Sequence, residues 1–201
     1  MAPAVKRIGR DRFRVRLGAE EIALLRNLPD QLRSVLVQPE PGPERSGEPR
    51  GGVPPARGGA MIGQEPTPEG APEAAPVDPV LERLFPRAYL EPEDVDRDAE
   101  YRRLVRDDLL QEKLANLDVV TSTIERGAMS MRRWTVDLSE DEAVAWLGAL
   151  NDLRLALGVR LGITEDFDGD VDPSDPRAPG LYVLSYLGWL EEHLVEALAS
   201  A

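Results

Sequence analysis

The sequence predicts a mainly α protein with a small β element, in which a helical domain contains two strand–helix units. Outside one Pro/Gly-rich stretch, apolar residues recur at the three- and four-residue spacing of buried helix faces. Two short segments instead alternate apolar and polar residues, as half-buried strands do. The first strand and its helix, from Phe13, return at a constant offset of 121 positions, from Trp134. We interpret this return as an internal repeat, and chance similarity between two amphipathic segments is the alternative.

Residues 1–37 hold the first strand–helix unit and a basic N-terminal arm. The strand is expected over residues 12–17, where apolar side chains alternate with arginines. The apolar side chains are Phe13, Val15 and Leu17, and the arginines between them are Arg12, Arg14 and Arg16. In the helix that follows, Pro29 takes the place that Leu150 has in the second unit. A proline inside a helix removes a hydrogen bond, so we expect a break or kink there.

Residues 38–77 form a linker that reads "QPEPGPERSGEPRGGVPPARGGAMIGQEPTPEGAPEAAPV". Met61 and Ile62 are almost its only large apolar residues, so it cannot bury enough surface to repay the entropy of folding. We therefore predict a disordered segment. Docking on a partner as a polyproline helix is the alternative.

Residues 78–201 are predicted to be helical around the second strand–helix unit, and to pack with residues 1–37 as one domain. Asp78 and Pro79 open a short helix, and a long charged helix follows over about residues 94–125. The second strand is expected over residues 133–138.

The second unit has a clear helix start, and the chain ends in a helix that is apolar over most of its girth. Ser139 is a natural N-cap, and Glu142 completes a capping box. The helix after it carries Trp146 on a leucine stripe, which predicts a core position. The last helix is expected over about residues 181–199.

Composition excludes several classes of protein. The formal net charge is -13, which opposes non-specific adhesion to DNA or anionic membranes. The chain has no cysteine, so it has no disulfide, no thiol nucleophile and no thiolate metal site. No segment resembles a membrane span or a signal peptide. We expect a cytoplasmic protein without membrane contact.

The residues offer little chemistry. His193, the one histidine, has no nucleophile motif nearby, and no glycine-rich phosphate loop is present. The acidic loop at residues 165–175 fits neither register of an EF-hand, since prolines and other residues stand where Gly and Glu are required. The loop is interpreted as a polar connection, with weak calcium binding as the alternative. The sequence therefore predicts no enzyme, no cofactor and no metal site.

The first sixteen residues are the basic part of an acidic chain. They carry a local charge of +5, six bases minus Asp11, which leaves -18 for the remainder. The candidate nucleic-acid-binding residues are Lys6, Arg7, Arg10, Arg12, Arg14 and Arg16. Such residues can neutralise phosphates. The alternative is an edge strand whose outward arginines prevent pairing with other sheets.

Three stretches, "DPVLERLFPRAY", "EYRRLVRDDL" and "AWLGALNDLRLALGVRLGI", resemble an actinobacterial family catalogued as a domain of unknown function. Its members include the oxidative-stress transcription regulator AosR. The resemblance implies a non-enzymatic transcription regulator of redox or cysteine-supply genes. It also implies RNA polymerase or a sigma factor as partner. A homodimer that doubles the basic arm would strengthen DNA contact.

The family resemblance leaves a second function open, and this chain departs from the family in one respect. An adaptor without DNA contact, for example for a Clp-type protease, is the alternative, because family genes often lie beside the gene for the ClpS adaptor. The redox sensing proposed for AosR relies on cysteines, which this chain lacks, so a disulfide switch is impossible here. Methionine oxidation at Met129 or Met131 is chemically available.

Overall fold

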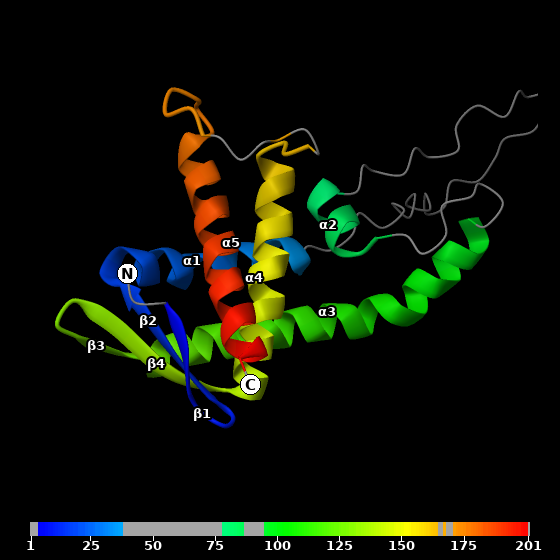
Figure 1. Ribbon diagram of the computed structural model, residues 1–201. Helices are drawn as coiled ribbons and strands as arrows, with labels where there is room; N and C mark the ends of the chain where they lie inside the picture. The colour runs from blue at the N-terminus through cyan, green and yellow to red at the C-terminus, as the bar shows by residue number, and fades with distance from the viewer. Residues whose placement is uncertain (1–3, 38–77, 87–94, 165–166, 168–170, 201) are drawn as a thin grey trace, which may run out of the picture. The chain divides into compact units, whose positions relative to one another are not determined.

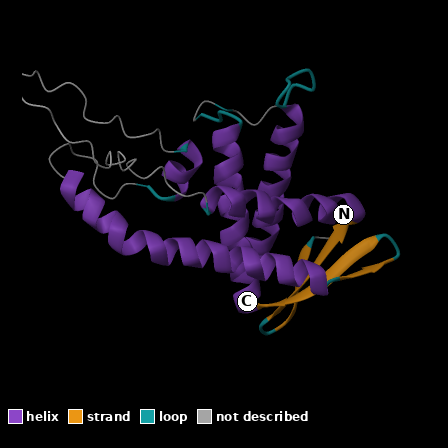
Figure 2. Cartoon of the chain, turned by 180° about the vertical axis from the view of Figure 1, so that it is seen from behind, coloured by secondary structure: helices purple, strands orange, loops and turns teal. Residues whose placement is uncertain are grey.

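The computed structural model describes residues 4–37, 78–86, 95–164, 167 and 171–200, with backbone only for 95–104. The prediction of a mainly α fold with a small β element is confirmed (Figure 2). The strands and helices are β1 (Val5–Gly9), β2 (Arg12–Gly18), α1 (Ala19–Leu36), α2 (Pro79–Leu84), α3 (Val95–Arg126), β3 (Ala128–Ser130), β4 (Arg133–Ser139), α4 (Glu140–Arg160) and α5 (Ala178–Ala199). None of the helices within these ranges is long and apolar enough to cross a membrane.

The four strands form one antiparallel sheet in the order β1-β2-β4-β3, so the two predicted strands are its central pair. Val15 pairs with Val136, and these two residues are 121 positions apart, the offset of the repeat. Phe13 pairs with Leu138, and Leu17 pairs with Trp134. This register maps each unit onto the other by a two-fold rotation through the Val15–Val136 pair. The repeat is therefore structural.

Each unit is a β-hairpin followed by a helix, β1-β2-α1 and β3-β4-α4. The two corresponding helices start in the same way. Their N-cap residues, Gly18 and Ser139, are 121 positions apart. The backbone N–H of each donates to the side chain of the glutamate three residues later, Glu21 or Glu142. The outer strands β1 and β3 were not predicted. The basic N-terminal arm that the sequence suggested is β1 and its hairpin, and Val5 lies in the core at 3% exposure.

The helices cover one face of the sheet (Figure 1). Helix α4 packs against α2, α3 and α5, while α5 also contacts β1. Trp134 of β4 and Trp146 of α4 stack with ring centres 6.4 Å apart, and both are almost fully buried. Gly127 permits this packing, since a Cβ there would lie 2.2 Å from the Trp134 ring. The prediction that Trp146 lies in the core is thus confirmed.

The expectation for Pro29 was wrong in one respect, because α1 is continuous from Ala19 to Leu36. Pro29 has no N–H to donate to the carbonyl four residues earlier, which should weaken the helix locally. The buried side chains on both sides of it, Leu25 and Leu32, hold α1 against the core and compensate for the missing bond. The predicted linker 38–77 and residues 165, 166 and 168–170 of the acidic loop lie outside the described residues, so the division of the chain into segments stays a prediction.

Candidate functional site

The sheet face that points away from the helices, here called the outer face, carries most of the predicted binding residues. Along β2 the side chains of Phe13, Val15 and Leu17 are buried, so the alternate residues project outward. The same alternation on β4 buries Trp134, Val136 and Leu138. The charged side chains of the outer face are Lys6, Arg12, Arg14, Arg16, Arg133 and Asp137. They sum to +4, five bases minus one acid.

Asp137 is the acidic member of this face, and Arg14 holds it. The two residues are direct cross-strand partners, with Nε 2.6 Å from Oδ1 and Nη2 2.8 Å from Oδ2. Arg12 lies farther away, with its Nη2 3.5 Å from Oδ2. The hydrogen bonds from Arg14 lower the pKa of Asp137, and the charges of Arg12 and Arg16 lower it further. Asp137 therefore stays ionised at neutral pH and partly neutralises the face.

The six predicted nucleic-acid-binding residues lie in three places: the outer face, the β1–β2 turn and the helix-facing side of β1. Lys6, Arg12, Arg14 and Arg16 lie on the outer face, and the structure brings them into neighbouring strands. Arg10 is in the β1–β2 turn, and it is exposed.

Arg7 lies on the helix-facing side of β1, opposite Phe13. Its guanidinium carbon is 5.6 Å from the centre of the Phe13 ring. It donates hydrogen bonds to the carbonyls of Gly9, at 3.2 Å, Arg10 and Ser200. The last of these ties β1 to the residue that follows α5. Arg7 thus has a structural role, whereas Lys6, Arg12 and Arg16 on the outer face are exposed to solvent.

Sequence reasoning missed Arg133, which is exposed at the start of β4. The signal was present, because Arg133 is 121 positions after Arg12 and so occupies the same place in the second unit. Asp137 was also missed as a partner of Arg14. That pairing depends on the register between two strands more than 100 residues apart, which neither segment reveals alone.

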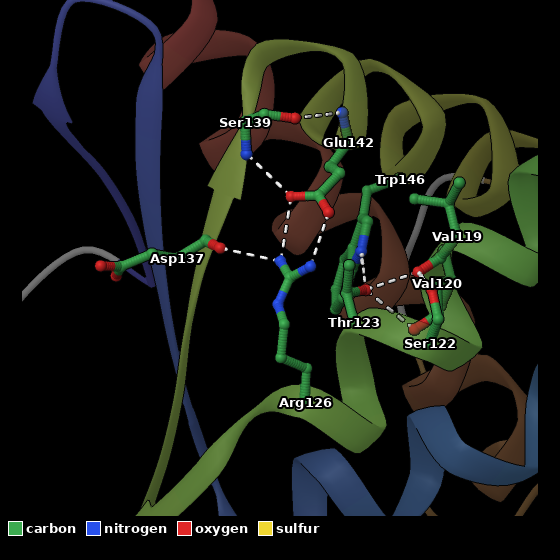
Figure 3. Close-up of polar contacts among 9 residues, drawn as sticks. All are labelled: Val119, Val120, Ser122, Thr123, Arg126, Asp137, Ser139, Glu142 and Trp146. Carbon is green, nitrogen blue, oxygen red and sulfur yellow. Dashed lines mark hydrogen bonds and ion pairs between the residues drawn. The ribbon is translucent and has the colours of Figure 1, made fainter.

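The end of β4 is fixed by a polar network that joins three elements (Figure 3). Arg126, the last residue of α3, donates to the Asp137 carbonyl at 3.0 Å and to both carboxylate oxygens of Glu142 at 2.7 and 3.0 Å. Glu142 in turn accepts from the Ser139 backbone N–H at 2.9 Å, which completes the predicted capping box. The hydrogen bonds from Arg126 are the main cause of the lowered pKa of Glu142. The network holds the strand that carries Asp137 and Arg133 in a fixed position relative to α3 and α4.

A second feature is a groove of about 790 Å³ between the C-terminal half of α4 and the N-terminal half of α5. Small residues, Gly158, Ser185 and Gly188, line part of it, and Arg154 lies on its wall in an ion pair with Glu191. No group of three or more histidine or acidic side chains suited to a metal ion occurs in the part of the chain that the structure describes. His193 packs against Trp189 with ring centres 4.4 Å apart, and its Nδ1 lies 2.9 Å from the Trp189 carbonyl.

Comparison with known proteins gives the family context. Residues 2–198 match the family described as "Domain of unknown function (DUF2017)". Proteins named "Oxidative stress regulator AosR" from Mycobacterium bovis and Mycobacterium tuberculosis are 32% identical to the chain over 135 residues. A protein named "Putative oxidative stress regulator AosR" from Mycobacterium leprae has the same identity and coverage. The matched region is 61% of this chain and 59% of each relative. No solved structure shows a significant match.

Proposed function

The chain belongs to the DUF2017 family, and on that premise we propose that it is a non-enzymatic regulator of the oxidative stress response. In this proposal it acts in the cytoplasm on transcription of redox or cysteine-supply genes, together with RNA polymerase or a sigma factor. Its outer face contacts DNA. The names of the mycobacterial relatives support the regulatory role. The match spans 59% of the length of each of those relatives. The activity of the whole relatives is therefore carried over to this chain only as part of the proposal.

The separation of charge in the fold is the observation that carries the DNA contact. The outer face has a net charge of +4 in a chain whose formal charge is -13. Cationic side chains gain affinity for DNA by releasing counterions from phosphates, while the acidic remainder is repelled. The chain alone should therefore bind DNA weakly and with a limited contact area. A protein partner or a homodimer would supply the remaining affinity and the sequence specificity.

The DNA contact can be tested by replacing three exposed arginines of the outer face, Arg12→Ala, Arg16→Ala and Arg133→Ala, in one variant. Fluorescence anisotropy with a labelled duplex, repeated at several salt concentrations, gives the affinity and its salt dependence. Each lost phosphate contact should reduce the slope of log K against log salt by about 0.9. We expect clear weakening and a shallower slope.

A matched control removes the same number of positive charges from the helices. Arg26, Arg83 and Arg160 are exposed residues of α1, α2 and α4. Their combined replacement by alanine should change DNA affinity much less than the outer-face variant does. Equal losses in both variants would indicate an effect of net charge alone and would remove the outer face from the proposal.

A protein adaptor without DNA contact, for example for a Clp-type protease, is the competing function. The groove between α4 and α5 favours it, because small and polar residues there leave room for a segment of another protein. Affinity purification of the intact chain from its own cells separates the two functions. Recovery of RNA polymerase or a sigma factor supports the regulator. Recovery of a protease complex, with no DNA binding by the purified chain, supports the adaptor.

A further inference from the structure

The β3–β4 hairpin turns through two residues with unusual backbone conformations. Met131 has φ 45° and Arg132 has φ 66°, which places both in the left-handed region. Glycine and asparagine are the residues that normally occupy such turns, because a Cβ is unfavourable there. The chain thus has a long apolar side chain and an arginine where the turn itself favours smaller residues. This departure points to a role for the side chains at the tip.

Both sulfur atoms in the described part of the chain lie on this hairpin. The chain has no cysteine and four methionines, of which Met1 and Met61 lie outside the described residues. Met131 is 97% exposed, the highest value among the large apolar residues whose side chains are described. Met129 is 51% exposed and pairs with buried Trp134, so it belongs to the helix-facing side of the sheet. Met131 is therefore the more accessible thioether.

Met131 also adjoins the outer face. Arg132 follows it in the turn, and Arg133 begins the outer-face positions of β4. Proteins that bind the minor groove of DNA frequently insert apolar side chains, methionine among them, between base steps, and they read the groove with basic and amide side chains. The tip has this composition, with an exposed apolar side chain before two exposed arginines. It would extend the DNA contact beyond the sheet.

We propose that Met131 is a site of reversible oxidation by hydrogen peroxide or an organic hydroperoxide, and that the sulfoxide weakens DNA binding by the outer face. The second part rests on the proposed function. The thioether sulfur donates an electron pair to one peroxide oxygen, the O–O bond breaks, and the other oxygen leaves as water or an alcohol after taking up a proton. Sulfur is oxidised by two electrons and the peroxide is reduced by two. The product side chain is polar, and methionine sulfoxide reductases reverse the change.

The oxidation site is tested first, without DNA. The purified chain is treated with increasing hydrogen peroxide, and peptide mass spectrometry follows each methionine separately. Because susceptibility follows exposure, Met131 should form sulfoxide about as fast as N-acetylmethionine amide, and Met129 at least about twofold more slowly. Reductases MsrA and MsrB together should restore the thioether. Faster oxidation of Met129, or protection of Met131 relative to the free amide, would overturn the inference while leaving the DNA contact of the outer face intact.

The consequence is tested with the same labelled duplex before and after peroxide. The native chain and Met129→Leu should both lose affinity on oxidation, by roughly fourfold, the effect of losing one buried methylene. In Met131→Leu the ratio of the affinities before and after peroxide should stay near one. An equal peroxide effect in Met131→Leu would refute the link between the sulfoxide and binding. If the untreated native chain binds no DNA, the proposed function fails, and the peptide map alone then decides whether Met131 is the preferred site.

Discussion

Asp137 sets the charge of the outer face, since it is the acid among five bases. Its pKa is lowered chiefly by the hydrogen bonds from Arg14. An aspartate with a lowered folded-state pKa stabilises the fold above the ordinary aspartate pKa of about 3.9. That contribution is lost as the pH falls through the lowered value. Near neutral pH, Asp137 is therefore a constant negative charge that keeps Arg14 from contacting a phosphate.

Asp137→Asn should strengthen DNA binding. The substitution removes one negative charge and frees Arg14 for a phosphate, so the salt slope should become steeper by up to about 0.9. Because the pair is partly exposed, the free energy of unfolding should fall by only about 0.2–1 kcal/mol. The matched control is Asp118→Asn, which removes the same charge from a residue paired with Arg33 on the helices. Tighter binding in the control alone would contradict the assignment of the DNA contact to the outer face.

Trp146 and Thr123 form a buried polar contact between α4 and α3. The indole Nε1 donates to the Thr123 hydroxyl at 2.8 Å, and both residues are fully buried (Figure 3). Trp146→Ala should reduce the free energy of unfolding by about 3–5 kcal/mol through the cavity it leaves. Thr123→Val keeps the volume but leaves the indole N–H without an acceptor, which should cost about 1–3 kcal/mol. Urea denaturation measures both. A Thr123→Ser variant that is as unstable as Thr123→Val would show that packing, and not the hydrogen bond, is responsible.

Helices and strands could be predicted from the sequence where a single segment has its own pattern of apolar residues or its own cap. Alternation predicted β2 and β4, periodicity and caps predicted the helices, and the 121-residue offset predicted that the two units correspond. Strands β1 and β3 were missed because they are short, and because none of the three residues of β3 is buried. Met131 and Arg132 occupy the β3–β4 turn, in place of the glycine or asparagine from which a hairpin turn is normally predicted.

The candidate site was predictable to a similar extent. Alternation along β2 identified the outward arginines, but it could not separate Arg7 from them. Arg7 precedes a shift in the β1–β2 register, and its partners include a carbonyl at the other end of the chain, at Ser200. The pairing of Arg14 with Asp137 likewise follows from the register of β2 with β4. Contacts between distant segments are properties of the fold, which local patterns do not encode.

The packing of α3 on α4 includes a buried ion pair. Lys113 Nζ lies 2.7 Å from Asp152 Oδ1, and the two side chains are 17% and 7% exposed. Burial raises the pKa of Asp152, and Lys113 opposes that rise. Lys113→Met would leave the carboxylate buried without its partner, so we expect a loss of about 3–5 kcal/mol at neutral pH.

The pH dependence of Lys113→Met has a definite sign. With its folded-state pKa raised further, Asp152 would hold a proton in the folded chain at a pH where the unfolded chain has lost it. The variant should therefore regain stability as the pH falls toward 5, and by more than the native chain does, because Lys113 limits the rise of the Asp152 pKa in the native chain. Replacing both residues, as Lys113→Met with Asp152→Leu, should recover most of the loss. Urea denaturation at two pH values tests this, and a single variant that is equally unstable at both would contradict it.

In the whole molecule, the two faces of the sheet differ in what covers them and in charge. One face is covered by helices and forms the core, and the other has a net positive charge in an acidic chain. The two-fold repeat explains why arginines start both central strands, at Arg12 and Arg133. The helices carry most of the acidic residues, which limits DNA contact to one face. A regulator that recruits a protein partner through its helices and DNA through its sheet fits this arrangement.

The most direct test of the central claim is an NMR titration of the ¹⁵N-labelled chain with a short DNA duplex at low salt. We expect the backbone amide shifts to change along residues 12–16 and 133–137, around Lys6, and at the Met131 tip. The amides of α5 should stay unchanged, because that helix lies behind the sheet. Changes concentrated along α4 and α5, or none at any DNA concentration, would contradict the claim that the outer face contacts DNA.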